Sequence, residues 1–129
     1  MRRTLEQALP ALLVMLGCLI ATAAAGAAGS TDRIFELTIL RGALPAEQRV
    51  LRAHKGDTVR LRLTSDAPGE IHLHGYRLVA KLAPAGPGEL VFNAHATGRY
   101  RLEWHPAGET SKPGGHHGPP LATLEVRPR

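Results

Sequence analysis

Apolar and polar residues alternate along most of the chain after residue 30, and this alternation predicts short β-strands. The segment 58–64 is the clearest example, because Val59, Leu61 and Leu63 alternate with polar or charged residues. Successive strand residues point to opposite faces, so the apolar set is expected to face a core. Similar or extended segments lie at 32–40, 48–54, 71–76, 76–82, 90–94, 99–104 and 121–126. Seven or eight short strands separated by turn residues are typical of an antiparallel β-sandwich or a small Greek-key barrel.

Residues 1–28 follow a different pattern and are predicted to be a secretory signal peptide. A basic start precedes an almost wholly apolar run from Ala8 to Ala28, with cleavage options after Ala25 or Ala27. A retained membrane helix is the alternative, but the run lacks a charged stop close behind it. We therefore expect an exported, periplasmic protein with one domain at 29–129 and no membrane span in its mature form.

Cys18 offers a second processing route, because Leu16-Gly17-Cys18 resembles a lipoprotein cleavage site. Met15 stands where such sites usually carry leucine, and the apolar run continues past the cysteine, so the cleaved signal is preferred. Cys18 is the only cysteine in the sequence, and residues 29–129 also lack methionine. No disulfide is predicted in the domain, which must be stabilised by packing, with a bound ion as a further contribution.

The charge of the chain argues against one large class of partner. It has 16 Lys and Arg residues against 11 Asp and Glu, but the arginines are spread along the predicted strands rather than gathered in a run. Aromatic residues make up only 4% of the chain, too few to provide stacking platforms for bases. Nucleic-acid binding is therefore not predicted. The positive excess fits a solvated face, or attraction to an anionic partner or membrane surface.

His72 and His74 alternate with apolar residues, so a strand here would place both imidazoles on one face. Same-face neighbours on a strand are about 6.5–7 Å apart, close enough for both rings to bind one metal ion. His105 is expected on the outer face as well, because Trp104 before it belongs to the apolar set of its strand. The alternative is that these histidines only decorate a solvated sheet.

The long connection 105–120 is rich in Pro and Gly and contains His116 and His117 beside His105. Long loops at one end of a sandwich often carry function, so these two histidines are candidate metal ligands. A flexible, exposed pair without a ligand is the alternative. His54 and His95 lie near predicted strand ends without companions and are interpreted as structural.

Four motifs together resemble the cupredoxin family. They are Lys-Gly-Asp-Thr-Val at 55–59, His-Leu-His-Gly-Tyr at 72–76, Thr-Gly-Arg-Tyr-Arg-Leu-Glu-Trp-His at 97–105 and a closing Leu-x-Val strand at 124–126. The resemblance covers essentially residues 32–128. It is strongest to small exported domains of the kind also found in periplasmic iron-uptake (EfeO-type) proteins. It implies an all-β, cupredoxin-like Greek-key sandwich or barrel of seven to eight strands.

The sequence departs from the blue-copper members that it resembles. Those proteins use a histidine, a cysteine, a second histidine and usually a methionine, whereas here Trp104 stands at the cysteine position and no methionine follows. A type 1 copper centre needs the thiolate. A blue-copper electron carrier is therefore not predicted.

Multicopper oxidases offer a second resemblance, because they carry one His-x-His-Gly on a strand and a later His-x-His after Gly-x-Tyr. Those histidines project outward and share a copper cluster with another domain. His72 and His74 match the first pair and His105 matches the second member of the later pair, whereas Glu103 stands at its first member. Only half of such a cluster is present, so an enzyme acting alone is not predicted. An oxidase that completes its cluster across an oligomer interface stays open.

These observations predict an exported metal-binding protein without catalytic residues. His72, His74 and His105 are expected to bind the metal, with His116 or His117 as a variable further ligand. Cu(II) is the expected ion because it leads the divalent affinity order at nitrogen sites, and zinc or iron are the alternatives. Metal delivery, buffering or uptake is the expected role, with other periplasmic metal-transport or copper-handling proteins as partners. An interaction domain that binds no metal is the competing interpretation.

Two carboxylates near the histidines have two interpretations. Glu70 and Glu103 are interpreted first as solvated partners of nearby arginines. Weak metal ligation, or accepting a hydrogen bond that orients an imidazole, is the alternative.

Overall fold

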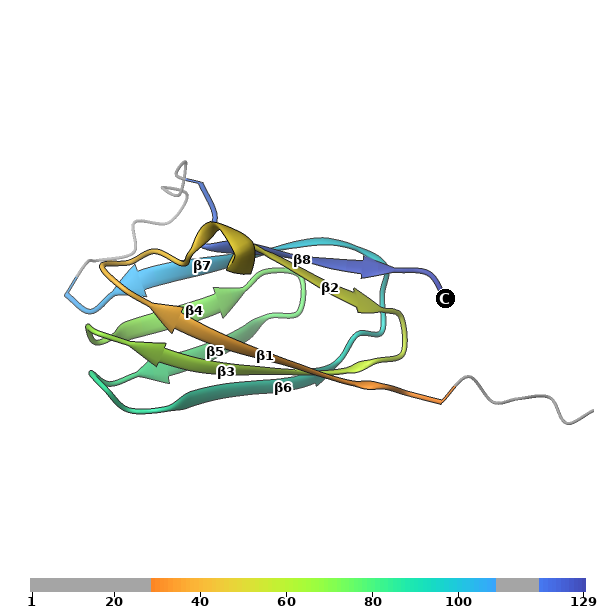
Figure 1. Cartoon of the computed structure of the whole chain (residues 1–129), viewed down its shortest axis with the longest axis horizontal. Coiled ribbons are helices and arrows are strands. Elements are labelled where there is room, and N and C mark those ends of the chain that lie inside the picture. The colour runs from red at the N-terminus through yellow and green to blue at the C-terminus, as the bar shows by residue number, and fades with distance from the viewer. Residues whose placement is uncertain (1–28, 109–118) are drawn as a thin grey trace, which may run out of the picture.

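A computed structural model describes residues 29–108 and 119–129, which form a β-sandwich of eight strands (Figure 1). The strands are β1 (Asp32–Ile39), β2 (Val50–His54), β3 (Thr58–Ser65), β4 (Gly69–Leu73), β5 (Leu78–Leu82), β6 (Gly88–Asn93), β7 (Gly98–Pro106) and β8 (Ala122–Arg127). A single 3-10 turn, η1 (Ala46–Gln48), is the one helical segment among the described residues. The prediction of an all-β sandwich with seven or eight strands is confirmed.

The strands form two sheets, of three and five strands. The smaller sheet has the order β1-β3-β6, and the larger has the order β2-β8-β7-β4-β5. The expectation of a purely antiparallel arrangement is wrong at two places, because β1 pairs with β3, and β2 with β8, in parallel. The chain changes sheet between β1 and β2, so these two strands are not neighbours, and each pairs with a strand further along the chain.

The core fills the space between the sheets, and the alternating pattern identifies it correctly. Val59, Leu61 and Leu63 of β3 are fully buried, as are Ile71 and Leu73 of β4. Burying one such side chain contributes about 1.5–3 kcal/mol. The apolar positions of β4 therefore fix which face of that strand turns inward, and with it the outward direction of the residues between them.

The extended segment predicted at 76–82 is shorter in the structure, because a turn occupies residues 74–77 and β5 begins at Leu78. Gly75 has a φ of +84°, and a Cβ there would lie 2.5 Å from the Tyr100 ring. Only glycine is compatible with both the backbone conformation and the close approach of that ring. The β4 strand therefore ends at a fixed place, at Leu73, between its histidine His72 and the first turn residue His74.

Some predictions concern segments outside the described residues. These are the signal peptide with its cleavage positions, the lipidation of Cys18, and the loop histidines His116 and His117. A search of the described segments, 29–108 and 119–129, finds no helix with the length and apolar character needed to cross a membrane.

Candidate functional site

Strands β4 and β7 bring three of the predicted ligands together on the outer face of the larger sheet. The antiparallel register pairs His72 with Glu103 and Glu70 with His105. His74 follows β4 directly, and its backbone N–H donates to the carbonyl oxygen of Arg101 at 2.9 Å. We call the five residues Glu70, His72, His74, Glu103 and His105 the outer-face cluster.

The three imidazole rings of the cluster are close to one another. The ring centroids of His72 and His105, on adjacent strands, are 4.2 Å apart. Those of His72, on β4, and His74, which directly follows that strand, are 6.5 Å apart. Three nitrogen donors therefore lie within one small patch, as the alternating pattern indicated.

Glu103 joins two of the histidines to an arginine. Its Oε2 lies 2.9 Å from Nε2 of His74 and 3.8 Å from Nε2 of His105, while Arg101 Nε donates to its Oε1 at 3.0 Å. Burial alone would raise the pKa of Glu103, but the charge and hydrogen bond of His74, with those of Arg101, hold it below the ordinary value. The carboxylate is thus ionised at neutral pH.

From the sequence, Glu103 is interpreted as a solvated partner of an arginine, and the solvated part of this interpretation is wrong. The arginine partner exists, but only 11% of the Glu103 side chain is exposed. Sequence reasoning underestimated this residue because alternation predicts the face of a strand and not how deeply that face is covered. The one available signal was that Arg101, Glu103 and His105 share a face.

Glu70 occupies a more exposed place at the edge of the cluster. Its Oε2 lies 3.1 Å from Nε2 of His72, and its Oε1 lies 3.8 Å from the ammonium of Lys81 on β5. The hydrogen bond with His72 is the main reason that the pKa of Glu70 is lowered. The partners of Glu70 are therefore a lysine and a histidine rather than an arginine.

The cluster has the donors of a metal site but not the finished arrangement of one. Within the described segments, no group of three or more His, Cys, Asp or Glu side chains is already placed to hold a metal ion. The Nε2 atoms of His72 and His74 instead face carboxylate oxygens. Imidazole and carboxylate are suitable ligands for divalent ions, so the chemistry fits, and side-chain rotation would have to complete the geometry.

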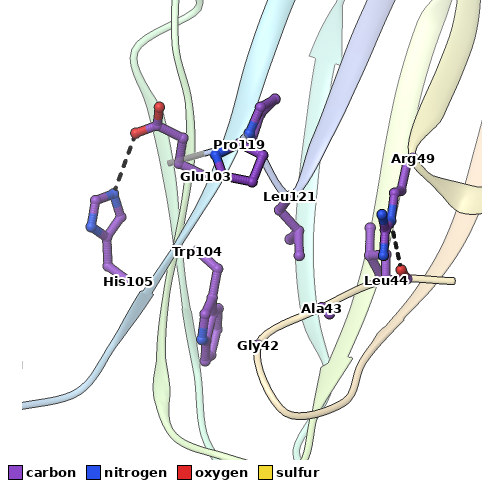
Figure 2. Close-up of a pocket in the computed structure, with 10 residues that line it drawn as sticks. Gly42, Ala43, Leu44, Arg49, Glu103, Trp104, His105, Pro119 and Leu121 are labelled. Atoms are coloured by element: carbon purple, nitrogen blue, oxygen red, sulfur yellow. Dashed lines mark hydrogen bonds and ion pairs between the residues drawn. The ribbon is translucent and has the colours of Figure 1, made fainter. Parts of the chain in front are cut away.

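Trp104 points away from the cluster, as predicted, toward the turn at Gly42 (Figure 2). A cavity of about 320 Å³ lies between this turn, Trp104 and Leu121, and His105 and Glu103 also contribute to its lining (Figure 2). Gly69 lies so close to the indole ring that a Cβ would be 2.5 Å from it. The tryptophan therefore fixes β7 from the inner side while its two neighbours face outward.

The remaining histidines of the described chain lie elsewhere. His95 packs against the edge of Tyr76, whose ring also contacts Phe92 and Tyr100. The hydroxyl of Tyr76 donates to the carbonyl oxygen of Ala96, which ties the turn after β4 to the smaller sheet's end. His54 is the last residue of β2 and is not part of the outer-face cluster or of the aromatic rings around Tyr76. The interpretation of His54 and His95 as structural residues stays a prediction.

Comparison with solved structures finds several copper proteins of the same architecture. A multicopper oxidase crystal structure matches with a TM-score of 0.57 and 20% identity, over 77% of this chain and 43% of the other. An apo copper-binding protein solved by NMR matches with a TM-score of 0.56 and 9% identity, over 76% of this chain and 90% of the other. A heme-copper terminal oxidase structure matches with a TM-score of 0.56 and 19% identity, over 74% and 65%.

The chain has a cupredoxin-like fold. The chain spans less than two thirds of the matched oxidase chains, so their activities belong to larger molecules. No protein-family model and no curated protein matches the sequence. The fold expected from the four motifs is therefore confirmed, whereas the particular likeness to iron-uptake proteins stays a prediction.

Proposed function

We propose that this cupredoxin-like protein binds Cu(II) through His72, His74 and His105 on its outer face and serves in copper handling, delivery or uptake after export. The observation that supports this most directly is the convergence of three imidazoles from two adjacent strands, with His72 and His105 at 4.2 Å between ring centroids. The role proposed is binding, without a catalysed reaction.

The donor types favour Cu(II) over other ions and over other copper chemistry. Imidazole nitrogen binds Cu(II) more strongly than it binds the other divalent first-row ions, and zinc is the next candidate. The only cysteine is Cys18, and the two methionines are Met1 and Met15, so residues 29–129 offer no sulfur ligand. A blue-copper centre requires thiolate, and the protein is therefore proposed not to carry electrons in that way.

To bind a metal ion, the histidines of the cluster must exchange their carboxylate partners for the ion. Nε2 of His74 faces Glu103 and Nε2 of His72 faces Glu70, so each imidazole must release a carboxylate or share the ion with it. His74 is half exposed and follows the end of β4, which leaves its side chain room to rotate. His105 is held inside the strand and supplies the fixed side of the site.

A second function is favoured by one observation, that no ready-made group of three metal-binding side chains exists in the described chain. On this alternative, the histidine–carboxylate pairs only stabilise the outer sheet face, and the domain acts by binding another macromolecule. The two functions predict opposite results for metal titration.

The deciding experiment is a competition titration of the metal-free purified protein with Cu(II) and with Zn(II), followed by electron paramagnetic resonance. We expect one equivalent of Cu(II) with a tetragonal nitrogen-and-oxygen spectrum, weaker Zn(II) binding and no intense blue absorption. An intense blue band would contradict the ligand assignment. Absence of specific Cu(II) binding would establish the interaction domain as the better proposal.

A further inference from the structure

We propose that Glu103 is itself a metal ligand, which binds the ion through Oε2 between His74 and His105. This inference rests on the proposed function and deepens it, because it defines a site of mixed nitrogen and oxygen donors. It assigns a direct role to a residue that sequence reasoning placed among the solvated ion pairs.

The first argument is the position of a single oxygen atom. Oε2 of Glu103 lies 2.9 Å from Nε2 of His74 and 3.8 Å from Nε2 of His105. These two nitrogens come from different strands, yet both point to the same carboxylate oxygen. With the side chains as they lie here, an ion bound by both nitrogens would lie beside that oxygen.

The second argument is that Glu103 is held in place. Arg101 Nε donates to the other oxygen, Oε1, at 3.0 Å, and the side chain is only 11% exposed. A carboxylate anchored through one oxygen keeps its second oxygen available in a fixed direction. Burial also limits competition from water, so the side chain has little reason to leave when an ion arrives.

Glu125 provides a comparison within the same sheet face. It lies on β8 beside β7, is similarly covered at 16% side-chain exposure, and pairs with Arg52, Arg99 and Arg127. These ion-pair partners are arginines, which bind no metal. Glu103 differs in having two imidazoles within 4 Å of one oxygen, so the feature that points to a metal is confined to Glu103.

A carboxylate ligand has a consequence for the oxidation state of the bound copper. Carboxylate oxygen is a hard donor that suits divalent ions, whereas Cu(I) prefers soft sulfur ligands. Glu103 is therefore expected to stabilise Cu(II) more than Cu(I). The site is therefore expected to bind Cu(II) more tightly than Cu(I).

The test compares Glu103→Gln, Glu103→Ala and the matched control Glu125→Gln in Cu(II) and Cu(I) competition titrations. Glutamine keeps the size of glutamate and one acceptor oxygen for Arg101, but it removes the charge and replaces the second carboxylate oxygen with an NH₂ group that cannot bind a metal ion. We expect Glu103→Gln and Glu103→Ala both to lose Cu(II) affinity by at least about tenfold, with a smaller loss for Cu(I). Glu125→Gln should stay within about twofold of the wild type, because its arginine contacts are remote from the histidines.

Each other outcome has a distinct meaning. If Glu103→Gln binds Cu(II) like the wild type while Glu103→Ala does not, Glu103 only positions His74 and the inference is wrong. If Glu125→Gln loses as much Cu(II) affinity as Glu103→Gln, the loss comes from removing any negative charge on this sheet face, and the inference is again overturned. If the wild type binds no Cu(II), the proposed function itself fails.

A measurement without substitutions keeps the test decisive if a Glu103 variant does not fold, which circular dichroism would reveal. In protein labelled with ¹³C, the side-chain carboxyl resonance of Glu103 should shift on addition of Zn(II), a diamagnetic probe. The corresponding resonance of Glu125 should not. Equal behaviour of the two carboxylates would exclude Glu103 as a ligand.

Discussion

Two buried carboxylates, Asp57 and Glu103, organise different regions of this sandwich with different kinds of partner. Asp57, 1% exposed, accepts hydrogen bonds from the backbone N–H of His54 and from two arginine side chains, Arg33 and Arg129. Glu103 has one arginine, and its other oxygen faces two histidines. Both carboxylates neutralise cations, but only the histidines of the second group can lose a proton or bind a metal.

The Asp57 group connects parts of the chain that are far apart in sequence. Arg33 lies at the start of β1 and Arg129 at the C-terminus, which lie at the same end of the sandwich (Figure 1). Burial alone would raise the pKa of Asp57, but the hydrogen bonds from His54 and Arg33 and the charges of Arg129 and Arg33 hold it below 3.8. Permanently charged partners and a backbone donor make this a structural link.

The comparison shows that the cationic or metal-binding side chains around a buried carboxylate, more than the carboxylate itself, determine how many states the group can adopt. An arginine stays protonated at any ordinary pH, so the Asp57 group has one stable arrangement. A histidine can be neutral, protonated or metal-bound, so the outer-face cluster has several. The two regions should therefore respond to different perturbations, and substitutions can separate them.

The largest effect on stability is expected for Asp57→Ala. The substitution leaves the His54 N–H without its acceptor and brings two guanidinium groups together without their common anion. We expect the free energy of unfolding to fall by about 2–4 kcal/mol, a range lowered from that of a fully buried pair because both arginines are partly exposed. Urea denaturation measures this loss.

The metal affinity of folded Asp57→Ala is the control for that prediction. Cu(II) binding should match the wild type, because no residue of the outer-face cluster contacts Asp57. If copper affinity fell together with stability, the two regions would not be independent, and the comparison would be wrong.

The double variant His74→Ala, His105→Ala should have the reverse effect. We expect a loss of Cu(II) affinity of about 100-fold or more, because removing two ligands costs more than the 10- to 100-fold typical of their supporting partners. His72→Ala alone should lose less. Both altered side chains point away from the core, so circular dichroism should show an unchanged fold. If the double variant bound copper like the wild type, His74 and His105 would not be the ligands, and His116 and His117 would be the next candidates.

Sequence reasoning located the outer-face cluster better than it described its contacts. The alternation of Ile71, His72 and Leu73 fixes which side chains turn outward, because the apolar residues must be buried. It could not show that Glu103 is covered or that its second oxygen faces two histidines, since these depend on the register between β4 and β7. Register is set by pairing across the sheet, which one strand's pattern does not contain.

The fold shows the same division between local and non-local information. The strands themselves follow from the period of two, whereas the turn at residues 74–77 interrupts the extended segments predicted at 71–76 and 76–82. The parallel pairing of β1 with β3 was missed, because no local signal reports which sheet a strand joins. The role of Asp57 was missed for a similar reason, since Arg33 and Arg129 are distant in sequence.

Acidification should test the Asp57 group through the link between pKa and stability. Because the folded pKa of Asp57 is below its ordinary 3.8, its contribution to stability is fully present above that pH and is lost as the pH falls through the folded value. The wild type should therefore lose stability below about pH 4 more steeply than Asp57→Asn, which cannot titrate there. Urea denaturation at several pH values from neutral to acid gives both curves. Parallel curves would show that the pKa of Asp57 is not lowered by folding.

The smallest effects are expected for His54→Ala and His95→Ala, and these variants sharpen the comparison because each lies beside a region without belonging to it. His54 supplies its backbone N–H to Asp57, and alanine keeps that donor, so only the imidazole is lost. His95 contacts the edge of Tyr76 and lies outside the outer-face cluster. We expect each variant to change Cu(II) affinity by less than about twofold and the free energy of unfolding by about 0.5 kcal/mol or less. Competition titration and urea denaturation measure both quantities on the same samples. A tenfold loss of copper affinity in either variant would show that a histidine outside the outer-face cluster binds the metal.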